Sequence, residues 1–412
     1  MLVGSLSSSP TCKFFRASPS PTSRSQPPLC SLPAARPRRC AVFTASRRRQ
    51  SARAHQHRLA PRASASTGML SPEVTAAAIA AAGLYALYRL VRFATADADL
   101  AALGKRPPAA GSFEGKVVWL VGASQGMGEV IAKYFSAHGA RVVLSARKEP
   151  ELRRVAAECG GEGRAAVVAL DIKAGAEELR GAVEAAYAAF GGAGVDVLVH
   201  VVGASQRSMA EDTVAEVDEE MFELNCLGPI RLTKAVLPRM LEAKSGHIAV
   251  VSSMAGILPS PGQSTYAGTK HALQGFFKSL AVEVCDRGIG VSLICPGPVM
   301  ADSSKPVRRV YGATGIVDAA DGGSLKTRVT PERVAQLLGT AVHHNLPEVW
   351  VAKHPVLALA YVFRFLPALG WMVLRKVGPK RARAVRDGKS GYDVQGLVGG
   401  TAGQGTSKAK DT

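Results

Sequence analysis

Tyr266 and Lys270 are the side chains in this sequence best suited to proton transfer. A helical pattern begins near Ser264, so this i, i+4 pair lies on one helix face. A phenol, with a pKa near ~10, transfers protons poorly at neutral pH unless a neighbouring cation favours the phenolate. Lowering that pKa towards ~7 takes about 4 kcal/mol, which one ammonium in a dry site can supply. Ser253 precedes Tyr266 by thirteen residues, so its hydroxyl can meet the phenol at a substrate oxygen.

Tyr-x-x-x-Lys also occurs on solvated helices without function, so the interpretation depends on a glycine-rich turn far upstream. Gly122, Gly126 and Gly128 follow a strand-length apolar run at 116–121 and open a helical pattern. A dinucleotide-binding turn requires this context, because glycines let the backbone approach a pyrophosphate at the helix N-terminus. The predicted cofactor contacts of the turn are Gly122, Ser124, Gln125, Gly126, Met127 and Gly128.

The end of the second expected strand favours NADP over NAD. It lacks the acidic residue that usually binds the 2′-hydroxyl of NAD, and Arg147 is available for the 2′-phosphate of NADP. A solvated basic turn is the alternative interpretation. Asp171, after the third expected strand, either accepts the adenine amino group or caps the next segment. We predict Ser145, Arg147 and Asp171 as cofactor contacts.

Composition and charge restrict the classes of protein that fit. The 412 residues suffice for one large domain with appendages or for two domains. The net charge is +19, but residues 1–68 hold twelve basic residues and no acidic one, which leaves about +7 elsewhere. No aromatic-interleaved basic face supports nucleic-acid binding. The seven cysteines show no metal-ligand spacing, so we expect reduced thiols and no metal site.

The N-terminal segments are expected to lie outside the catalytic domain. Residues 1–68 resemble an organellar transit peptide in composition; an upstream extension with Met69 as the true start is the alternative. Residues 69–93 contain the apolar run 74–91, which predicts a membrane anchor helix, with an Ala-rich soluble helix as the competing interpretation. Residues 94–112 form a polar linker.

Between 113 and 352, apolar runs of strand length alternate with helical patterns. The expected strands cover 116–121, 141–144, 165–170, 195–200, 247–251, 291–295 and 348–351. Besides the helix after the glycine turn, helices are expected near 150–159, 175–190, 217–243, 264–286 and 331–344. This alternation predicts an α/β fold, a Rossmann-type doubly wound parallel sheet flanked by helices.

The C-terminal extension at 353–387 is apolar, is broken by Arg364 and Pro367, and ends in a basic run. It fits a membrane interface, or else a helix that folds back on the domain or lines the substrate mouth. Residues 388–412 are expected to be disordered.

Together these elements resemble the short-chain dehydrogenase/reductase family over roughly 113–352. The likeness is carried by Gly122, Gly126, Gly128, Asp171, Asn225, Ser253, Tyr266, Lys270 and the segment Pro296-Gly297-Pro298-Val299. Four further stretches, RFATADADL, SQRS, ICPGPV and PEVWVAKHP, indicate one branch of the family. They extend the resemblance to nearly everything after Met69.

The resemblance implies a role for each matching residue. Tyr266 would be the general acid that protonates a carbonyl oxygen as NADPH delivers hydride, and the base in reverse. Lys270 would lower the pKa of Tyr266 and bind the nicotinamide ribose. Ser253 would hydrogen-bond the substrate oxygen, and Asn225 would hold a water in the proton relay. The other implied cofactor contacts are Gly203, Pro296, Gly297 and Val299.

Two departures from the family pattern are expected to weaken stability and cofactor binding. The family has Asn-Asn-Ala-Gly after the fourth strand, whereas this chain has His-Val-Val-Gly at 200–203. Ala301 replaces the threonine that hydrogen-bonds the nicotinamide carboxamide, and Asp302 or Ser303 is left to substitute for it.

The resemblance and the two apolar flanks imply a membrane-associated NADP(H)-dependent oxidoreductase, a homodimer without a nucleic-acid partner. Its expected substrate is an apolar carbonyl or alcohol of steroid, retinoid or long-chain type. The location is the chloroplast if 1–68 is a transit peptide, where an acyl or pigment carbonyl would be reduced, and otherwise the endoplasmic reticulum. A nucleotide-binding scaffold with little turnover is the alternative, motivated by 200–202 and Ala301.

Overall fold

The computed structural model describes residues 71–300, 307–320 and 325–387, all of which belong to one unit of the chain, Leu70–Thr412. The transit-like segment 1–68, the tail 388–412 and the positions Ala301, Asp302 and Ser303 lie outside the described residues.

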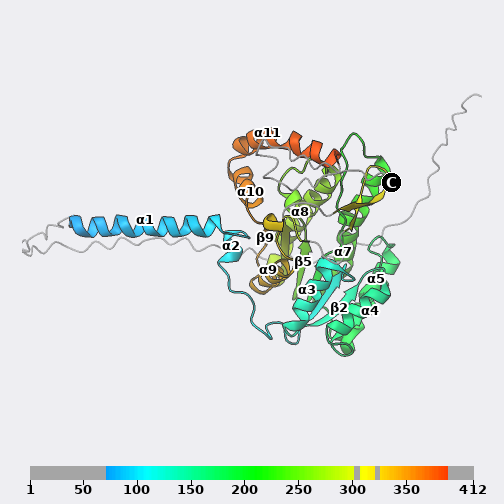
Figure 1. Cartoon of the computed structure of the whole chain (residues 1–412). Coiled ribbons are helices and arrows are strands. Elements are labelled where there is room, and N and C mark those ends of the chain that lie inside the picture. The colour runs from blue at the N-terminus through cyan, green and yellow to red at the C-terminus, as the bar shows by residue number, and fades with distance from the viewer. Residues whose placement is uncertain (1–70, 301–306, 321–324, 388–412) are drawn as a thin grey trace, which may run out of the picture. The chain divides into compact units, whose positions relative to one another are not determined.

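Seven parallel strands form the central sheet, in the order β3-β2-β1-β4-β5-β6-β9 (Figure 1). Their bounds are β1 Val117–Val121, β2 Arg141–Ser145, β3 Ala165–Val167, β4 Val197–His200, β5 Gly246–Val251, β6 Ile289–Pro296 and β9 Glu348–Val351. Every residue of β1 is buried, as expected for a continuous apolar run covered on both faces. In the register, Leu120 of β1 lies opposite Leu144 of β2 and Val199 of β4. The predicted doubly wound parallel sheet is confirmed.

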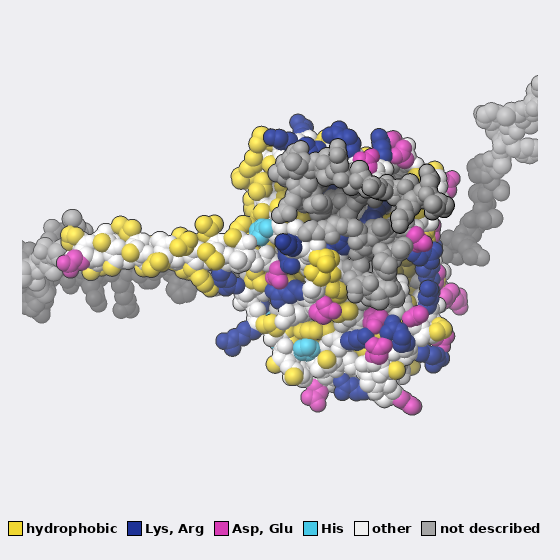
Figure 2. Space-filling model, in the orientation of Figure 1, with side chains coloured by type: hydrophobic (Ala, Val, Ile, Leu, Met, Phe, Trp, Pro, Cys, Tyr) yellow, Lys and Arg dark blue, Asp and Glu magenta, His cyan; other side chains and the backbone are white. Residues whose placement is uncertain are grey.

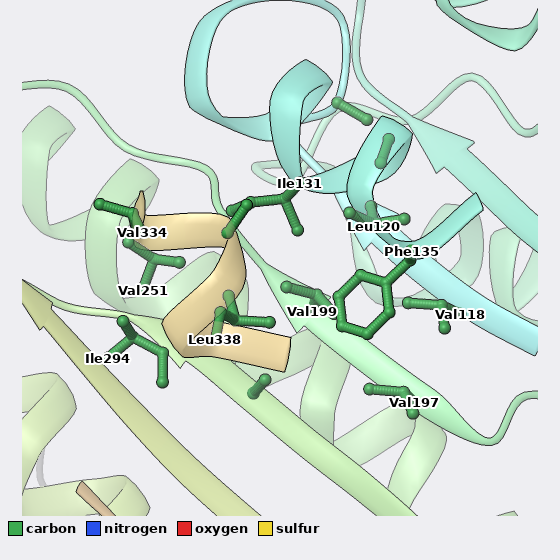
Figure 3. Packing of buried hydrophobic residues seen from close by; sticks show 14 of the residues in the cluster. Val118, Leu120, Ile131, Phe135, Val197, Val199, Val251, Ile294, Val334 and Leu338 are labelled. Atoms are coloured by element: carbon green, nitrogen blue, oxygen red, sulfur yellow. The ribbon is translucent and has the colours of Figure 1, made fainter. Parts of the chain in front are cut away.

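Helices cover both faces of the sheet, and successive residues of β1 face the two layers in turn. One layer contains α3 (Gly126–Ala137), α4 (Glu149–Glu158) and α9 (Pro331–His344), and the other contains α5 (Ala176–Gly192), α7 (Gly228–Ala243) and α8 (Ser264–Val284). Leu120 belongs to the first core with Phe135 and Leu338 (Figure 3). Trp119 belongs to the second core with Phe277. The two buried layers hold the sheet, and with it the strand ends, in place.

Three details differ from the sequence-based expectation. The single helix expected at 217–243 is α6 (Ala215–Phe222), a π-helical turn (Glu223–Leu227) and α7. β3 is shorter than the expected 165–170 and ends at Val167, although the amides of Val168 and Leu170 still donate to the carbonyls of Leu144 and Ala146. The hairpin of β7 (Val307–Tyr311) and β8 (Ile316–Ala320) was not expected. A backbone hydrogen bond between distant segments attaches the hairpin to the domain: the Tyr311 amide donates to the carbonyl of Ser205 at 2.9 Å.

α1 (Pro72–Ala94) is the one helix in the described ranges that is long and apolar enough to cross a membrane, and none of its residues is buried. Ser71 caps its N-terminus by accepting a hydrogen bond from the amide of Val74. α2 (Leu100–Leu103) follows, capped by Asp99, whose second carboxylate oxygen accepts the amide hydrogen of Trp350 at 2.6 Å. The segment after α1 is therefore fastened to β9.

The C-terminal extension forms two helices, α10 (Val356–Phe365) and α11 (Pro367–Arg386), that fold back on the domain (Figure 1). Leu357 and Ala360 of α10 are buried with Met254 and Trp350. The chain breaks at Pro367, as predicted. The structure thus shows the fold-back that was one of the two interpretations of this segment. Short 3-10 helices occupy Met254–Gly256, Cys285–Arg287 and Leu325–Thr327.

Candidate active site

A cavity of about 1210 Å³ lies at the carboxyl ends of β1, β4, β5 and β6. The strand order reverses between β1 and β4, and ligands of doubly wound sheets bind outside the strands at such a point. The glycine turn forms one wall of the cavity, and α10 and α11 contribute to another. The cavity therefore joins the predicted cofactor site to the C-terminal extension.

The glycine turn is shaped by close backbone contacts. A Cβ on Gly128 would lie 2.0 Å from the carbonyl oxygen of Gly122, and one on Gly122 would lie 2.8 Å from the amide nitrogen of Val202. Gly126 has a φ of +60° and open space where a side chain would be, and it is the first residue of α3. The side chain of the preceding Gln125 does not cap α3, so it leaves the first backbone amides of the helix available. This open cradle at a helix N-terminus fits a pyrophosphate.

Of three other residues predicted to hold the nucleotide, two line the cavity and one does not. Arg147 is exposed just after β2 and lines the cavity. Asp171 also lines it, while one of its carboxylate oxygens accepts the amide hydrogen of Lys173 at 3.0 Å. Ser145 is fully buried, and its hydroxyl accepts a hydrogen bond from Trp119 Nε1 at 2.8 Å. Ser145 is not among the residues that line the cavity. It supports β1 from behind the site.

α8 carries Tyr266 and Lys270 on one face, as the spacing predicts. The Lys270 ammonium lies 5.8 Å from the centroid of the Tyr266 ring and donates to the carbonyl of Val251 at 3.0 Å. Tyr266 lines the cavity, whereas Lys270 is buried behind it. Burial disfavours the charged amine and lowers the pKa of Lys270 to about 8, an effect partly offset by the nearby Cys295 and Cys226. The pair thus places a cation beside a phenol that reaches the cavity.

Asn225 lies in the π-helical turn, a feature that often occurs at functional sites. Its side-chain oxygen accepts the amide hydrogen of Ala204 at 2.8 Å, and its side-chain nitrogen donates to the carbonyl of Ala204 at 2.9 Å. A Cβ on Gly203 would come within 3.1 Å of Asn225 and 3.5 Å of the Lys270 ammonium. Asn225 therefore clamps the chain after β4 next to Lys270.

Ser253 and its neighbour Ser252 both line the cavity, together with the segment 296–299. The Ser253 hydroxyl donates to the carbonyl of Pro296 at 3.4 Å and accepts the amide hydrogen of Ala255 at 3.1 Å. The Gly297 amide donates to the carbonyl of Val351 at 2.8 Å. These bonds hold the predicted nicotinamide wall, Pro296, Gly297 and Val299, against β9 and next to Ser253.

His200, at the family's first asparagine, has a partner of its own. Its Nε2 atom lies 2.8 Å from the Thr233 hydroxyl of α7, while its Nδ1 has no hydrogen-bond partner within the described ranges. Burial lowers the pKa of His200 to about 3, so the ring is neutral at pH 7. The histidine therefore links β4 to α7 through one of its two ring nitrogens. Nowhere in the described part do three His, Cys, Asp or Glu side chains gather as a metal ion would require.

A polar network that sequence reasoning missed connects the substrate side of the cavity to α11. Arg381 Nη2 donates to Gln263 Oε1 at 2.8 Å, and Gln263 Nε2 donates to the Ser205 hydroxyl at 2.8 Å. Gln206, which is fully buried, accepts the amide hydrogen of Tyr266 at 3.1 Å. The only sequence signal was the stretch SQRS at 205–208, because the partners are far apart in the chain.

Comparisons with known proteins agree with this geometry. The family model described as short chain dehydrogenase matches residues 116–311. Dehydrogenase/reductase SDR family member 7 of Homo sapiens is 37% identical over 323 residues, which cover 76% of this chain and 92% of that protein. Dehydrogenase/reductase SDR family member 7B of Mus musculus is 32% identical over 313 residues, which cover 75% of this chain and 90% of that protein.

A solved structure supports the fold. A short-chain dehydrogenase from Streptomyces avermitilis matches with a TM-score of 0.54 and 26% identity, over 64% of this chain and 98% of that one. The four stretches that indicated one branch of the family are consistent with the similarity to family member 7. The chain belongs to the short-chain dehydrogenase/reductase family of oxidoreductases.

Proposed function

We propose that this protein is an NADP(H)-dependent, membrane-anchored oxidoreductase that interconverts an apolar carbonyl and its alcohol. One observation carries the proposal. Ser253 and Tyr266 line the same cavity as the glycine turn, with the Lys270 ammonium buried behind the phenol. A cofactor cradle, a proton donor and a cation to stabilise its phenolate therefore meet in one cavity.

The nucleotide would be held at both ends of the cavity. The pyrophosphate would rest on the turn of Gly122, Ser124, Gln125, Gly126, Met127 and Gly128. Arg147, exposed beside the turn, would bind the 2′-phosphate, and Asp171 would accept from the adenine amino group with its remaining lone pairs. Gly203, Lys270, Pro296, Gly297 and Val299 would border the nicotinamide riboside. When bound, this cofactor supplies the hydride.

Proton transfer would be the work of the chain's own residues. Tyr266 would donate its hydroxyl proton to the carbonyl oxygen as that oxygen gains charge, and Ser253 would donate a hydrogen bond to the same oxygen. Lys270 would stabilise the resulting phenolate, and it is near enough to do so without contact with solvent. Asn225, held by Ala204, would keep Gly203 beside Lys270 and position a water for the relay.

The walls beyond Tyr266 support an apolar substrate. The α10 and α11 side of the cavity is lined by aliphatic side chains, among them Leu359, Val362, Leu369, Val373, Leu374 and Val377. Hydrophobic burial would supply most of the binding energy for a steroid, retinoid or long-chain carbonyl. Arg381 and Gln263 are among the polar groups on that side.

The location of the protein follows from two segments. α1, apolar and with no buried residue, would anchor the chain in a membrane. That membrane would belong to the chloroplast if 1–68 is a working transit peptide, and otherwise to the endoplasmic reticulum. Family membership suggests a homodimer.

The experiment is to purify the full chain in detergent and follow nicotinamide absorbance with a panel of apolar carbonyls, using NADPH and NADH in parallel. We expect turnover with both long-chain and polycyclic carbonyls and a preference for NADPH. Nucleotide binding without turnover in either direction would overturn the reductase proposal in favour of a scaffold. Equal efficiency with NADH would contradict the role of Arg147.

A further inference from the structure

The corner between α10 and α11 exposes an unusual run of large apolar side chains. They lie within eight residues: Phe365, Leu366, Leu369, Trp371 and Met372. Phe365 is 70% exposed, Met372 63% and Trp371 48%. In Figure 2, yellow side chains gather over α10. A contiguous patch of this kind on a soluble surface usually marks a binding site.

The corner is close to the end of the anchor helix. The Phe93 ring at the end of α1 lies 5.0 Å from the His354 ring and 5.5 Å from the Tyr361 ring, centroid to centroid. Tyr361 in turn stacks on Phe365 at 6.2 Å. The Phe93 carbonyl also accepts a hydrogen bond from His354 Nε2 at 2.7 Å. A short path of aromatic contacts therefore leads from α1 to the first side chain of the corner.

The charge around the corner suits an anionic lipid surface. No Asp or Glu occurs from 349 to 386, whereas eight Lys or Arg residues do. Arg364 and Arg375 flank the corner, Lys376 and Lys380 follow on α11, and all four are exposed. Long basic side chains reach headgroups while their stems cover apolar surface, and each is attracted to an anionic membrane.

The corner is also continuous with the substrate cavity. Leu369 is 40% exposed at the surface and lines the cavity, and Val373, one turn further along α11, lines it as well. On α10, Val362 lines the cavity one turn before the exposed Phe365. Apolar side chains thus run without interruption from the surface into the cavity.

We propose that the α10–α11 corner inserts into the headgroup region of the bilayer that α1 anchors, so that apolar substrate enters the cavity from the lipid. This inference rests on the membrane anchoring in the proposed function and adds a second membrane contact. An interfacial element needs an apolar face rimmed by basic residues, and this corner has both. Phe365, Trp371 and Met372 occupy the lipid, and Arg364, Arg375 and Lys376 meet the phosphates.

Trp371 provides a direct test, because the other two tryptophans, Trp119 and Trp350, are buried in the domain. The full chain is reconstituted into anionic vesicles that contain either ordinary lipid or lipid brominated at shallow acyl positions, which quenches nearby indoles. We expect the native chain to lose a larger fraction of its emission in brominated vesicles than Trp371→Phe does. Equal fractional losses in both chains would overturn the proposal. The same result is expected if a second copy of the chain, rather than lipid, covers the corner.

A second pair of variants tests substrate entry. Phe365→Glu combined with Met372→Glu should abolish the quenching of Trp371 and raise KM for a carbonyl delivered in vesicles, without changing KM for a small water-soluble carbonyl. Val282→Glu, at an apolar residue of α8 that is 75% exposed, is the matched control and should change neither. An unchanged KM for the vesicle-borne carbonyl in the double variant would contradict entry from the lipid.

Flotation of the vesicles separates this proposal from the anchoring on which it rests. α1 is intact in every variant, so each should float with the vesicles. A native chain that does not float contradicts the anchor itself, whereas flotation without quenching of Trp371 contradicts only the corner.

Discussion

The glycine turn forms the proposed cofactor side of the cavity, and the wall near α10 and α11 forms its proposed substrate side. The two sides are built in different ways. The glycine turn depends on close backbone contacts: Gly128 packs on Gly122, and Gly122 packs on the backbone of Val202. The substrate side depends on contacts between distant segments, such as Arg381 with Gln263 and Ser208 with Gly312. One side is thus set by the close approach of backbone to backbone, and the other by side-chain contacts between late and early segments of the chain.

This difference predicts different responses to mutation. A side chain added at Gly122 or Gly128 should damage folding and nucleotide binding together, because its Cβ would meet backbone atoms. A change in α10 or α11 should alter the choice and affinity of substrate while leaving the nucleotide bound. Four substitutions test this contrast.

The largest effect is expected from Gly128→Ala. Its Cβ would lie 2.0 Å from the Gly122 carbonyl oxygen, so the free energy of unfolding should fall by about 1–3 kcal/mol or more, with loss of NADPH binding. Thermal unfolding and NADPH fluorescence titration measure the two quantities. Gly181→Ala on α5, where a Cβ meets nothing within 4 Å, is the control and should be neutral or stabilising by up to ~1 kcal/mol. Normal NADPH affinity in Gly128→Ala would refute the steric account.

Arg147→Ala should change nucleotide binding alone. Loss of a charge-assisted hydrogen bond of about 1.5–3 kcal/mol should weaken NADPH binding by roughly 10- to 100-fold and leave NADH binding unchanged. Titration of both nucleotides measures the ratio. Arg153→Ala, at an exposed ion pair with Glu149 on α4, controls for the loss of a positive charge. A parallel loss of NADH affinity in Arg147→Ala would show that the arginine does not read the 2′-phosphate.

Arg381→Leu tests the substrate side. Without its donor, Gln263 holds Ser205 less firmly, and a net hydrogen bond of about 1 kcal/mol corresponds to a KM roughly fivefold higher for the carbonyl. NADPH affinity and kcat should stay near native values. Arg383→Leu, at an exposed position on the same helix, should leave KM unchanged. A drop in NADPH affinity with Arg381→Leu would remove the distinction between the two sides.

His200 lies in the sheet that both sides share, and its replacement should have the smallest effect at neutral pH. Its pKa is about 3 in the fold and ~6.5 in the unfolded chain, so the unfolded state binds the extra proton. Stability is therefore complete above pH 6.5 and falls as the pH drops from 6.5 towards 3, by up to about 1.4 kcal/mol per unit. His200→Asn should reduce that slope in urea unfolding at pH 7, 6 and 5. An unchanged slope would mean that His200 is not buried and neutral.

The sequence predicted most of the sheet and many of the residues that line the cavity. Continuous apolar runs such as 117–121 predict buried parallel strands, and each of the seven expected strands is present. Tyr266, Ser253 and the glycine turn could be placed together because parallel strands deliver their carboxyl ends to one edge. Ser145 was predicted as a cofactor contact and lies outside the cavity lining, because its hydroxyl accepts from Trp119, which the strand pattern does not show.

The substrate side could not be predicted to the same extent. The apolar pattern of 356–377 fits a membrane surface and a packed helix equally well, and only the contacts of Leu357 and Ala360 show that α10 packs on the domain. The β7–β8 hairpin depends on Tyr311, which is buried by a segment about a hundred residues earlier. Gln206 carries no local pattern that marks it as a partner of the Tyr266 amide.

The most direct test of the central claim is a single-turnover measurement with Tyr266→Phe. The variant is mixed with NADPH and a carbonyl that the native chain reduces, and the decay of NADPH fluorescence is followed. We expect NADPH to bind with native affinity and its oxidation to slow by roughly 10²- to 10⁴-fold, because the ring remains and only the proton donor is lost. Oxidation within a few-fold of the native rate would contradict Tyr266 as the general acid.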